Sequence, residues 1–338
     1  MNEMTKFLRF FLLGLCITST AFCITDYSRI TMEVLVSIVD ENGNPLPKSE
    51  VNIYFQHTYP QERALRKSGN LITKVYDGEN KITAKYSGRN SLGVRVEKEG
   101  YWRSQLSYRF AEKDRIDVKD GSPNGHYRKE FTVVMRKKEN PRPLYVNRVG
   151  VWVPGFNQPF GFDLEKADWV APHGKGVHSD FIFTFKRELK TFHVFRGDMA
   201  LSFSNPSDGV VKVVDPEVPY SRLLLGKYAP LGGYTDGLDQ VLGLEENEGV
   251  YKKLTKPTVK ELDRIKGYWF RVRSGKLIDG VPQDARYGKV LGHFSFEVRN
   301  DNPTVSFTYF FSPDTSRSLE WNGENLLPEA NLQGVDKY

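Results

Sequence analysis

Short runs in which apolar and polar residues alternate recur along almost the whole chain. In residues 32–39, 181–185 and 305–311 an apolar side chain occupies every second position. Successive side chains of a β-strand point to opposite faces, so a period of two predicts strands with one buried face. Gly, Asn, Asp or Pro bounds most of these runs, as expected of turns between neighbouring strands. The sequence therefore predicts a mainly β fold built from packed sheets.

The strands gather in two blocks, and 338 residues are enough for about two domains. Residues 24–138 are predicted to form an antiparallel β-sandwich, and residues 148–338 a second β-sandwich or jelly-roll-like domain. Residues 139–147 contain two prolines and are expected to be an extended linker. The expected strands are 32–39, 51–55, 71–76, 81–86, 92–97, 104–110 and 130–136 in the first block, and 149–153, 168–171, 180–185, 191–195, 199–203, 210–214, 268–273, 290–298 and 305–311 in the second.

Two segments of the second block do not follow this alternation. Residues 259–266 (VKELDRIK) come after Pro257 and are expected to form two helical turns. Residues 216–256 contain many Gly and Pro residues, so we expect long loops there.

The N-terminus has the pattern of a secretory signal peptide over residues 1–23. Lys6 and Arg9 precede the apolar run 10–17, and Ala21 and Cys23 occupy the small-residue positions of a cleavage site. The apolar run is shorter than the ~20 residues that cross a bilayer. Export to the periplasm or the extracellular space is therefore predicted. An uncleaved anchor and lipid attachment at Cys23 are the alternatives.

Cysteine content and charge exclude several classes of protein. The two cysteines, Cys16 and Cys23, both lie in the predicted signal peptide, so the mature chain would have no disulfide, cysteine nucleophile or thiolate metal site. The net charge of the full chain is +6, and basic residues are interleaved with acidic ones. The densest basic run, 136–138, is typical of a solvated strand end. We therefore predict no nucleic-acid partner, and no membrane span after cleavage because no other stretch is apolar enough.

Three segments of the first block carry a family-like pattern: VSIVDENGNPLPKSEVNIYF (36–55), KVYDGENKITAKY (74–86) and LGVRVEKEGYWRS (92–104). They resemble the carboxypeptidase regulatory-like domain, a transthyretin-like or immunoglobulin-like β-sandwich. The matching positions are Asp40, Gly43, Pro45, Leu46, Asp77, Gly78, Gly100 and Tyr101. Of these, Gly43 and Gly78 are expected to form turns, because glycine tolerates positive φ. The sequence departs from the family at Ile82, where an aromatic residue is expected, and in the long insertion 56–70. The resemblance implies an accessory module without catalytic residues. The second block is similar to uncharacterised exported bacterial proteins.

The densest group of chemistry-bearing residues lies in 163–180. It contains Asp163, Glu165, Asp168, Trp169, His173, His178 and Asp180. Carboxylates and imidazoles in one Gly-containing loop could bind a divalent cation. However, the two histidines are five residues apart, unlike the i, i+4 pair of a helical zinc site. A polar connection between two strands is the favoured interpretation of this group, so no metal site and no cofactor are predicted.

Signatures of catalysis are missing from the sequence. Jelly-roll glucanases carry a Glu-x-Asp-x-x-Glu strand motif. In this chain Glu261 and Asp263 match its first two carboxylates, but Lys266 occupies the position of the third. There is no Gly-x-Ser-x-Gly elbow, P-loop, dinucleotide-binding Gly-x-Gly-x-x-Gly or His-Glu-x-x-His motif. No catalytic residue is therefore predicted.

Aromatic side chains provide the remaining candidate for function. Sugars stack their C–H faces on exposed aromatic rings. Core packing is the expected role of each of the five tryptophans, and Trp169 and Trp321, which lie next to polar loop residues, are the candidates for an exception. The predicted ligand-binding residues are Trp169, His173, His178, Asp180 and Trp321.

Three functional hypotheses remain open. The first is an exported, non-enzymatic binding or surface-associated protein whose partner is a polysaccharide or another cell-envelope component. The second is a glycan-active enzyme with Asp168 or Asp180 as acid/base in a cleft lined by Trp169. The third is a structural subunit that assembles through an apolar patch. The sequence leaves the oligomeric state open.

Overall fold

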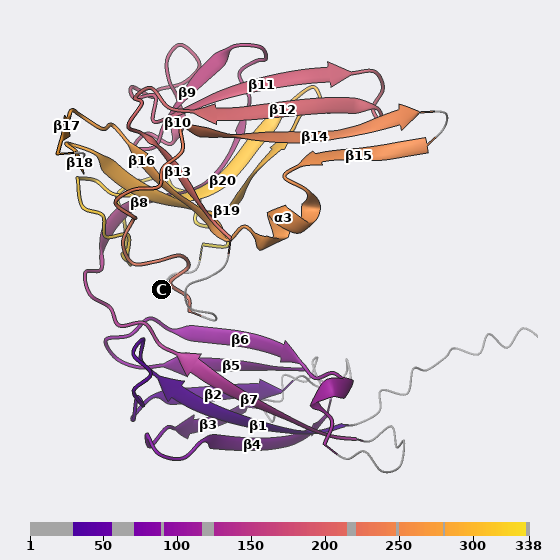
Figure 1. Cartoon of the computed structure of the whole chain (residues 1–338), viewed down its shortest axis with the longest axis vertical. Helices are drawn as coiled ribbons and strands as arrows, with labels where there is room; N and C mark the ends of the chain where they lie inside the picture. Colours follow the sequence, from indigo (N-terminus) through magenta and orange to yellow (C-terminus); the bar gives the residue numbers. More distant parts are fainter. Residues whose placement is uncertain are drawn as a thin grey trace, which may run out of the picture.

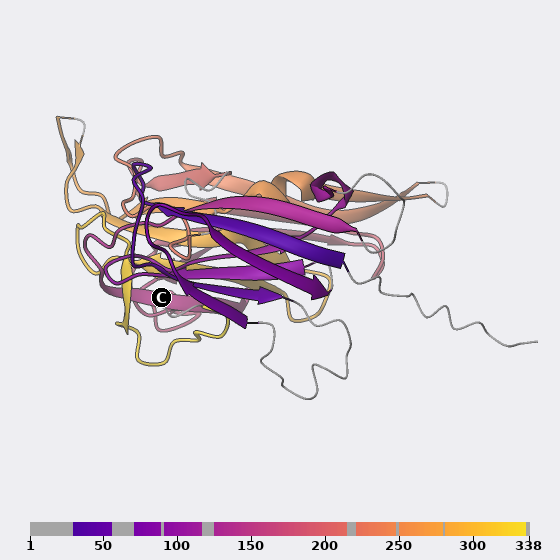
Figure 2. The ribbon, with the colours of Figure 1, turned by 90° about the horizontal axis from the view of Figure 1, so that it is seen from below.

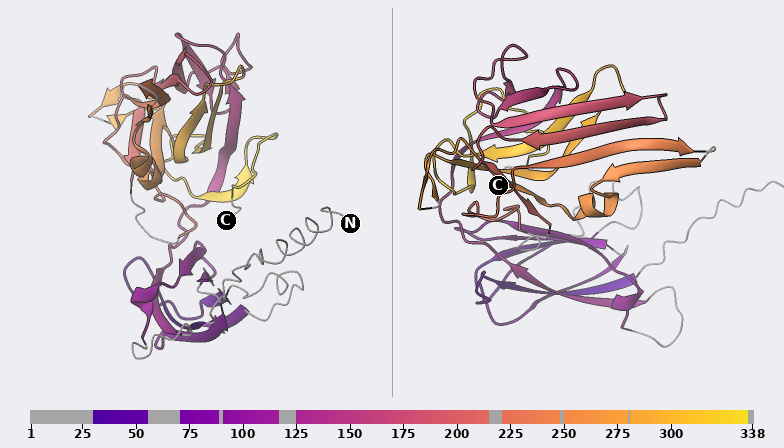
Figure 3. Two further views of the ribbon diagram at one scale, coloured as in Figure 1. Left: turned by 90° about the vertical axis from the view of Figure 1, so that its right-hand side faces the viewer. Right: turned by 45° about the horizontal axis from the view of Figure 1, so that its top comes forward.

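The chain folds into two β-sandwiches that stack along the long axis of the molecule (Figure 1). The computed structural model describes residues 30–55, 71–88, 91–116, 125–214, 221–247, 250–279 and 281–335. The predicted signal peptide with Cys16 and Cys23 and the insertion 56–70 lie outside the described residues. A view turned by 90° shows the same two bodies, one above the other (Figure 3). The predicted mainly β fold is confirmed.

The first sandwich packs a three-stranded sheet, in the order β4-β1-β7, against a four-stranded sheet, in the order β3-β2-β5-β6 (Figure 2). Its elements are β1 (Ile30–Val39), β2 (Glu50–Phe55), β3 (Leu71–Val75), β4 (Ile82–Gly88), β5 (Ser91–Glu97), β6 (Ser104–Arg109), the 3₁₀ helix η1 (Glu112–Asp114) and β7 (His126–Val134). β1 pairs with β7 in parallel, whereas the other described strand pairs of this sandwich are antiparallel. The sandwich is therefore mixed rather than purely antiparallel.

Two similar turns connect strands of the first sandwich. After β1, the Asp40 carboxylate accepts hydrogen bonds from the backbone N–H groups of Asn42 and Asn44 at 2.9 and 2.8 Å. Before β4, Asp77 accepts from two backbone N–H groups in the same way. Gly43 and Gly78 have φ of 84° and 100°, a region that a side chain disfavours. The predicted turn roles of both glycines are confirmed.

The second sandwich packs two six-stranded sheets, β10-β9-β11-β12-β14-β15 and β13-β16-β19-β20-β8-β21. Its elements are β8 (Arg142–Trp152), β9 (Pro159–Asp163), β10 (Asp168–Trp169), β11 (Phe181–Leu189), β12 (Phe195–Ser202), β13 (Gly209–Val213), β14 (Gly237–Asn247), β15 (Val250–Lys256), α3 (Val259–Arg264), β16 (Gly267–Val272), β17 (Leu277–Ile278), β18 (Val281–Pro282), β19 (Arg286–Glu297), β20 (Thr304–Phe311) and β21 (Trp321–Asn325). The short pair β17-β18 stands apart from both sheets.

Aromatic rings fill the space between these two sheets. Phe181, Phe183 and Phe185 of β11 are fully buried, as their alternation predicts. The Phe181 ring meets that of Phe270 edge-on at 4.9 Å, and the Phe183 ring lies 5.8 Å from that of Phe307. Edge-to-face and offset contacts at these distances add to the hydrophobic gain of burial. The core therefore fixes how the two sheets face each other.

Several predicted boundaries in the second half differ from the structure. Residues 142–147, expected in the linker, are the first half of β8. Within 216–256, expected to be loops, the long hairpin β14-β15 forms. The strand expected over 191–195 is the turn between β11 and β12, apart from Phe195. The helix expected after Pro257 is present as α3. No helix in the described part of the chain is long and apolar enough to cross a bilayer.

Buried hydrogen bonds join the two sandwiches. The carboxylate of Glu320, just before β21, is fully buried and accepts from the indole Nε1 of Trp102 in the first sandwich at 2.7 Å. It also accepts from the backbone N–H groups of Glu139 and Asn140 between the sandwiches. A carboxylate that takes several donors from both sides holds these segments together.

Three charged side chains continue this junction. Arg136, after β7, donates to Glu41 and to the backbone oxygen of Leu225. Lys227 of the second sandwich donates to Glu41 at 2.5 Å. Lys289 is completely buried beneath them, and its Nζ donates to the oxygen of Leu224 at 3.3 Å. Burial, together with the positive charge of Arg136, lowers the pKa of Lys289 to about 7.

Candidate functional site

The predicted site in 163–180 is a folded loop held by one buried carboxylate. Asp163, at the end of β9, accepts backbone N–H groups of Glu165 and Lys166 through Oδ1 at 2.8 and 3.0 Å. Its Oδ2 accepts those of Val177 and His178 at 2.8 and 2.9 Å. Burial raises the pKa of Asp163, but the four donors outweigh it and bring the pKa below the ordinary value. Asp163 therefore closes the loop upon itself.

Asp180, the second buried carboxylate of this loop, is paired with an arginine. Its oxygens accept from Nε and Nη2 of Arg273 at 2.7 and 2.9 Å and from the backbone N–H of Leu164 at 2.9 Å. Burial raises the pKa of Asp180, and Arg273 opposes that effect. Arg273 also reaches Glu165, which in turn pairs with Arg286. Asp163, Glu165 and Asp180 thus meet in one ion-pair network around Arg273, whereas Asp168 lies outside it and accepts from the backbone N–H groups of Trp169 and Lys175.

Both tryptophans that the sequence offers as candidate exceptions to core packing are buried, so neither provides a surface for stacking a sugar. Trp169 is 4% exposed and Trp321 is 0% exposed. The indole Nε1 of Trp169 donates to the backbone oxygen of Trp152, and that of Trp321 to the backbone oxygen of Glu324. Trp169 and Trp321 also belong to different core clusters. The exposed tryptophan is Trp152, at 70%.

The two histidines of the loop are exposed at its surface. The ring of His173 packs against Phe160 at 5.0 Å, and His178 contributes its backbone N–H to Asp163. In the described part of the chain no group of three His, Cys, Asp or Glu residues is placed to hold a metal ion. The structure brings Trp169, His173, His178 and Asp180 into one loop and leaves Trp321 apart from it.

A cleft of about 450 Å³ lies elsewhere, between β13 and β14 at the edge of the second sandwich. Backbone hydrogen bonds in both directions between Val210 and Thr235 hold the segment before β14 beside β13. At two positions, Gly209 and Gly237, an added Cβ would lie 2.2 Å from a backbone oxygen. Only glycine fits there, so the mouth of the cleft has a fixed backbone. The lining residues are Val210, Val211, Lys212, Gly233, Thr235, Gly237, Leu238, Asp239, Gln240, Pro257 and Tyr268.

Gln240 is the unusual residue of this cleft. Its pairing with the buried Met199 places its side chain on the inner face of the sheet, and it is only 5% exposed. Its amide Nε2 is buried and meets no acceptor at full hydrogen-bond geometry in the described ranges, although the Tyr268 hydroxyl lies close enough to interact with the Gln240 side chain. A buried donor without an acceptor costs about 1–3 kcal/mol. A water molecule or a ligand that entered the cleft could accept a hydrogen bond from this amide.

Tyr268 of β16 lies beside Gln240 and completes the polar side of the cleft. Burial raises the pKa of Tyr268 to about 12, with the Gln240 side chain acting in the opposite direction. The hydroxyl therefore stays protonated at physiological pH and can both donate and accept a hydrogen bond. The amide and the hydroxyl together offer a ligand at least two donors and two acceptors.

A second hollow, about 560 Å³, adjoins the cleft on the outer face of β11, β12 and β14. The two hollows share Asp239 and Gln240. Basic and acidic side chains alternate on this face, and Arg196 pairs with Asp198 at 2.9 Å. Mixed charges without a dominant sign suit an uncharged, hydrogen-bonding ligand.

Sequence reasoning missed this site because residues 216–256 were expected to be loops. A signal was present, since Leu238, Gln240, Leu242 and Leu244 occupy alternate positions. This alternation is typical of a strand whose apolar side chains face inward. Gln240 is the one polar residue among these four positions, and this marks it as a candidate. Tyr268 was predicted in a strand, but nothing in its neighbours distinguishes it from an ordinary core tyrosine.

Comparisons with known proteins assign this chain to no family. No family model matches the chain, and no curated protein does. Among solved structures, 3-chlorocatechol 1,2-dioxygenase from Rhodococcus opacus 1CP matches with 12% identity and a TM-score of 0.26, over 33% of this chain and 62% of the dioxygenase. Catechol 1,2-dioxygenase from Acinetobacter radioresistens matches with 16% identity and a TM-score of 0.26, over 33% and 53%. The match spans little more than half of these dioxygenases, and a likeness this weak carries no argument about function.

Proposed function

We propose that this protein is an exported, non-enzymatic binding protein whose second sandwich holds an uncharged, hydroxyl-rich ligand in the cleft between β13 and β14. The observation that carries the proposal is the buried amide of Gln240, which faces this cleft beside the Tyr268 hydroxyl and has no acceptor at full hydrogen-bond geometry in the described part of the chain. Natural proteins rarely leave such a donor unsatisfied, and functional sites are where the exceptions gather.

The chemistry of the lining favours a glycan segment. A sugar hydroxyl can accept from Gln240 and exchange a hydrogen bond with Tyr268 in the cleft, while Asp239 faces the adjoining hollow. The volume of about 450 Å³ lies within the ordinary range of small-molecule sites. A polysaccharide chain could extend from the cleft over Asp239 into the adjoining hollow.

The ionisable groups of this region favour binding over catalysis. A glycosidase needs two carboxylates that flank the scissile bond, one of them able to give up a proton. Asp163 and Asp180 are instead committed to backbone N–H groups and to Arg273. The cleft itself contributes one carboxylate, that of Asp239.

Binding of neutral oligosaccharides to the purified full chain tests the proposal. We expect the wild-type protein to bind at least one neutral oligosaccharide in calorimetric titration, and Gln240→Leu and Tyr268→Phe each to weaken that binding at least tenfold. Gln158→Leu, on an exposed loop between β8 and β9, is the matched control and should bind like the wild type. Melting curves establish that each variant is folded.

Two outcomes would overturn the proposal. One is that no neutral oligosaccharide binds, and the other is that Gln240→Leu binds as tightly as the wild type. Export is tested separately, by cell fractionation and the intact mass of the mature protein. Cleavage after Cys23 would remove both cysteines, so a mature chain that reacts with a thiol reagent would contradict it.

A further inference from the structure

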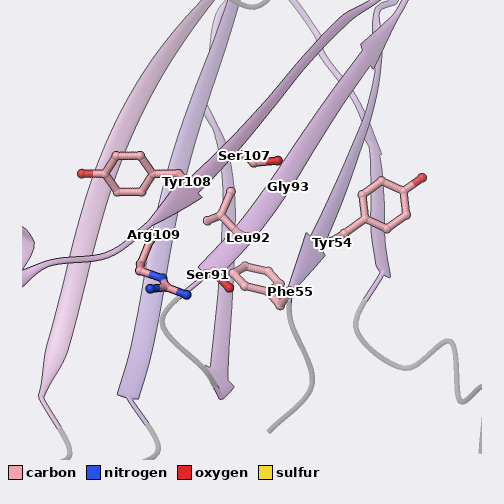
Figure 4. A pocket seen from close by; sticks show the side chains of 8 residues that line it. All are labelled: Tyr54, Phe55, Ser91, Leu92, Gly93, Ser107, Tyr108 and Arg109. Carbon is pink, nitrogen blue, oxygen red and sulfur yellow. The ribbon is translucent and has the colours of Figure 1, made fainter. Parts of the chain in front are cut away.

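The first sandwich has a hollow of about 470 Å³ on the outer face of β2, β5 and β6 (Figure 4). Tyr54, Gly93 and Ser107 lie directly opposite one another on the three strands. Opposed residues point to the same face, so the missing side chain of Gly93 leaves a gap between Tyr54 and Ser107. Figure 4 shows the Tyr54 ring and the Ser107 hydroxyl on either side of Gly93.

The glycine at the centre of this hollow is not required by the backbone. A Cβ added at Gly93 would meet only the backbone oxygen of Leu106, at the ordinary contact distance of 3.7 Å. Its φ also lies outside the region that favours glycine. The strand could therefore carry a side chain here, so the gap is not imposed by packing, in contrast to Gly237.

Arginines lie on both sides of the gap. Arg109, opposite Ser91, lines the hollow and makes no ion pair with any residue in the described ranges. On the other side, the guanidinium of Arg95 lies 5.8 Å from the centroid of the Tyr54 ring. Its Nε is buried and has no hydrogen-bond acceptor within the described segments. Among the described residues no carboxylate lines the hollow, so the field of these residues favours an anion.

We propose that this hollow is a second binding site, which holds a sugar ring that carries a carboxylate. The C–H face of the ring stacks on Tyr54 over Gly93, and the carboxylate is held by Arg109, while Arg95 on the far side adds to the positive field. The choice of a sugar among ring-bearing acids rests on the proposed function of the second sandwich. The residues of this site differ from those of the cleft at Gln240, and they favour an anionic ligand rather than an uncharged one.

The test compares one acidic oligosaccharide with its neutral counterpart on the full chain. Oligogalacturonate and the corresponding carboxyl-reduced oligosaccharide are titrated into the wild-type protein. We expect the acidic form to bind at least tenfold more tightly, and the difference to shrink as salt rises from 50 to 500 mM, because exposed charges are then screened.

Three variants locate the site. Gly93→Val fills the gap and should abolish binding of oligogalacturonate, Tyr54→Ala should weaken it about tenfold, and Arg109→Gln at least fivefold. Tyr251→Ala and Arg128→Gln replace an exposed tyrosine of β15 and an exposed arginine of β7, and both should bind like the wild type. Melting curves show whether Gly93→Val retains the fold, and Arg109→Gln gives an independent result if it does not.

The outcomes also separate this inference from the proposed function. Unchanged binding of oligogalacturonate in Gly93→Val and Arg109→Gln would overturn the second site, whatever the Gln240 variants do. Equal affinity for the acidic and the neutral oligosaccharide would overturn the assignment of charge. Loss of acidic binding in Gln240→Leu, with Gly93→Val unaffected, would move the anionic ligand to the cleft and contradict the inference.

Discussion

The loop 163–180 and the cleft at Gln240 belong to the same sandwich but treat buried polar groups in opposite ways. In the loop, Asp163 and Asp180 accept seven hydrogen bonds between them from backbone and arginine donors. In the cleft, the amide of Gln240 is buried with an unused donor. The loop contains many more ionisable residues, yet they support the fold. The comparison teaches that the satisfaction of a buried polar group, rather than the density of such groups, points to a ligand.

The largest effect is expected where a satisfied charge loses its partner. Asp180→Ala should destabilise the protein by about 3–5 kcal/mol, because the guanidinium of Arg273 remains half-buried without its main acceptor. Urea denaturation followed by fluorescence measures the change. Glu297→Ala, which breaks the more exposed pair with Arg299, is the control and should cost less than about 1 kcal/mol. If Asp180→Ala lowered the free energy of unfolding by less than Glu297→Ala does, the structural role assigned to the loop would be wrong.

Lys289 extends the comparison to the junction, where a buried ammonium has a single long hydrogen bond. Its folded pKa of about 7 lies below the unfolded value of 10.5, so between these values the unfolded chain binds more protons. Stability from this group therefore rises with pH from about 7 toward 10.5. Lys289→Met should raise the free energy of unfolding by about 2–3 kcal/mol near pH 6. The stability of this variant should no longer rise with pH between about 7 and 10.5. Equal slopes for variant and wild type in denaturation at pH 6–9 would contradict the buried, ill-satisfied state.

Gln240 provides the reciprocal test of stability and binding. Gln240→Leu removes the unused donor at similar volume, so it should stabilise the protein by about 1 kcal/mol while it weakens ligand binding. Thermal melting with and without the bound oligosaccharide measures both effects. Destabilisation by more than about 1 kcal/mol would mean that the amide is already satisfied in the free protein, and the comparison with the loop would fail.

Trp152 should give the smallest effect. Its ring is 70% exposed, and the backbone oxygen that accepts from Trp169 does not depend on its side chain. Trp152→Ala should therefore change stability by no more than about 0.5 kcal/mol and leave binding at the cleft unchanged. A change in oligosaccharide affinity measured by calorimetry would show that exposed aromatic rings, and not unsatisfied donors, locate the ligand in this sandwich.

The sequence predicts what depends on neighbouring residues. Alternation found the buried face of 181–185, and Asn-Gly and Asp-Gly pairs found the turns at Gly43 and Gly78. Sequence reasoning did not find the hairpin β14-β15, because the Gly and Pro content of 216–256 was given more weight than the alternation of Leu238, Leu242 and Leu244.

Properties that depend on distant segments were beyond sequence reasoning. Trp169 is buried because the end of β8 supplies an acceptor for its indole, and Trp321 because Phe310 packs on its ring. The pairing of Asp180 with Arg273 joins residues 93 positions apart. The candidate site depends on the same kind of information, since the burial of Gln240 is set by β13 and β16.

The hydrogen bonds of Glu320 with Trp102 and the linker have a consequence for how long polymers would bind. A carboxylate that binds both sandwiches keeps the hollow at Gly93 in the first sandwich and the cleft at Gln240 in the second at a fixed distance from each other. A polysaccharide that reached both would meet the second hollow at a high effective concentration once the first was occupied. Chain length would then act as a selectivity filter, with short fragments bound weakly and chains that bridge the spacing retained by avidity.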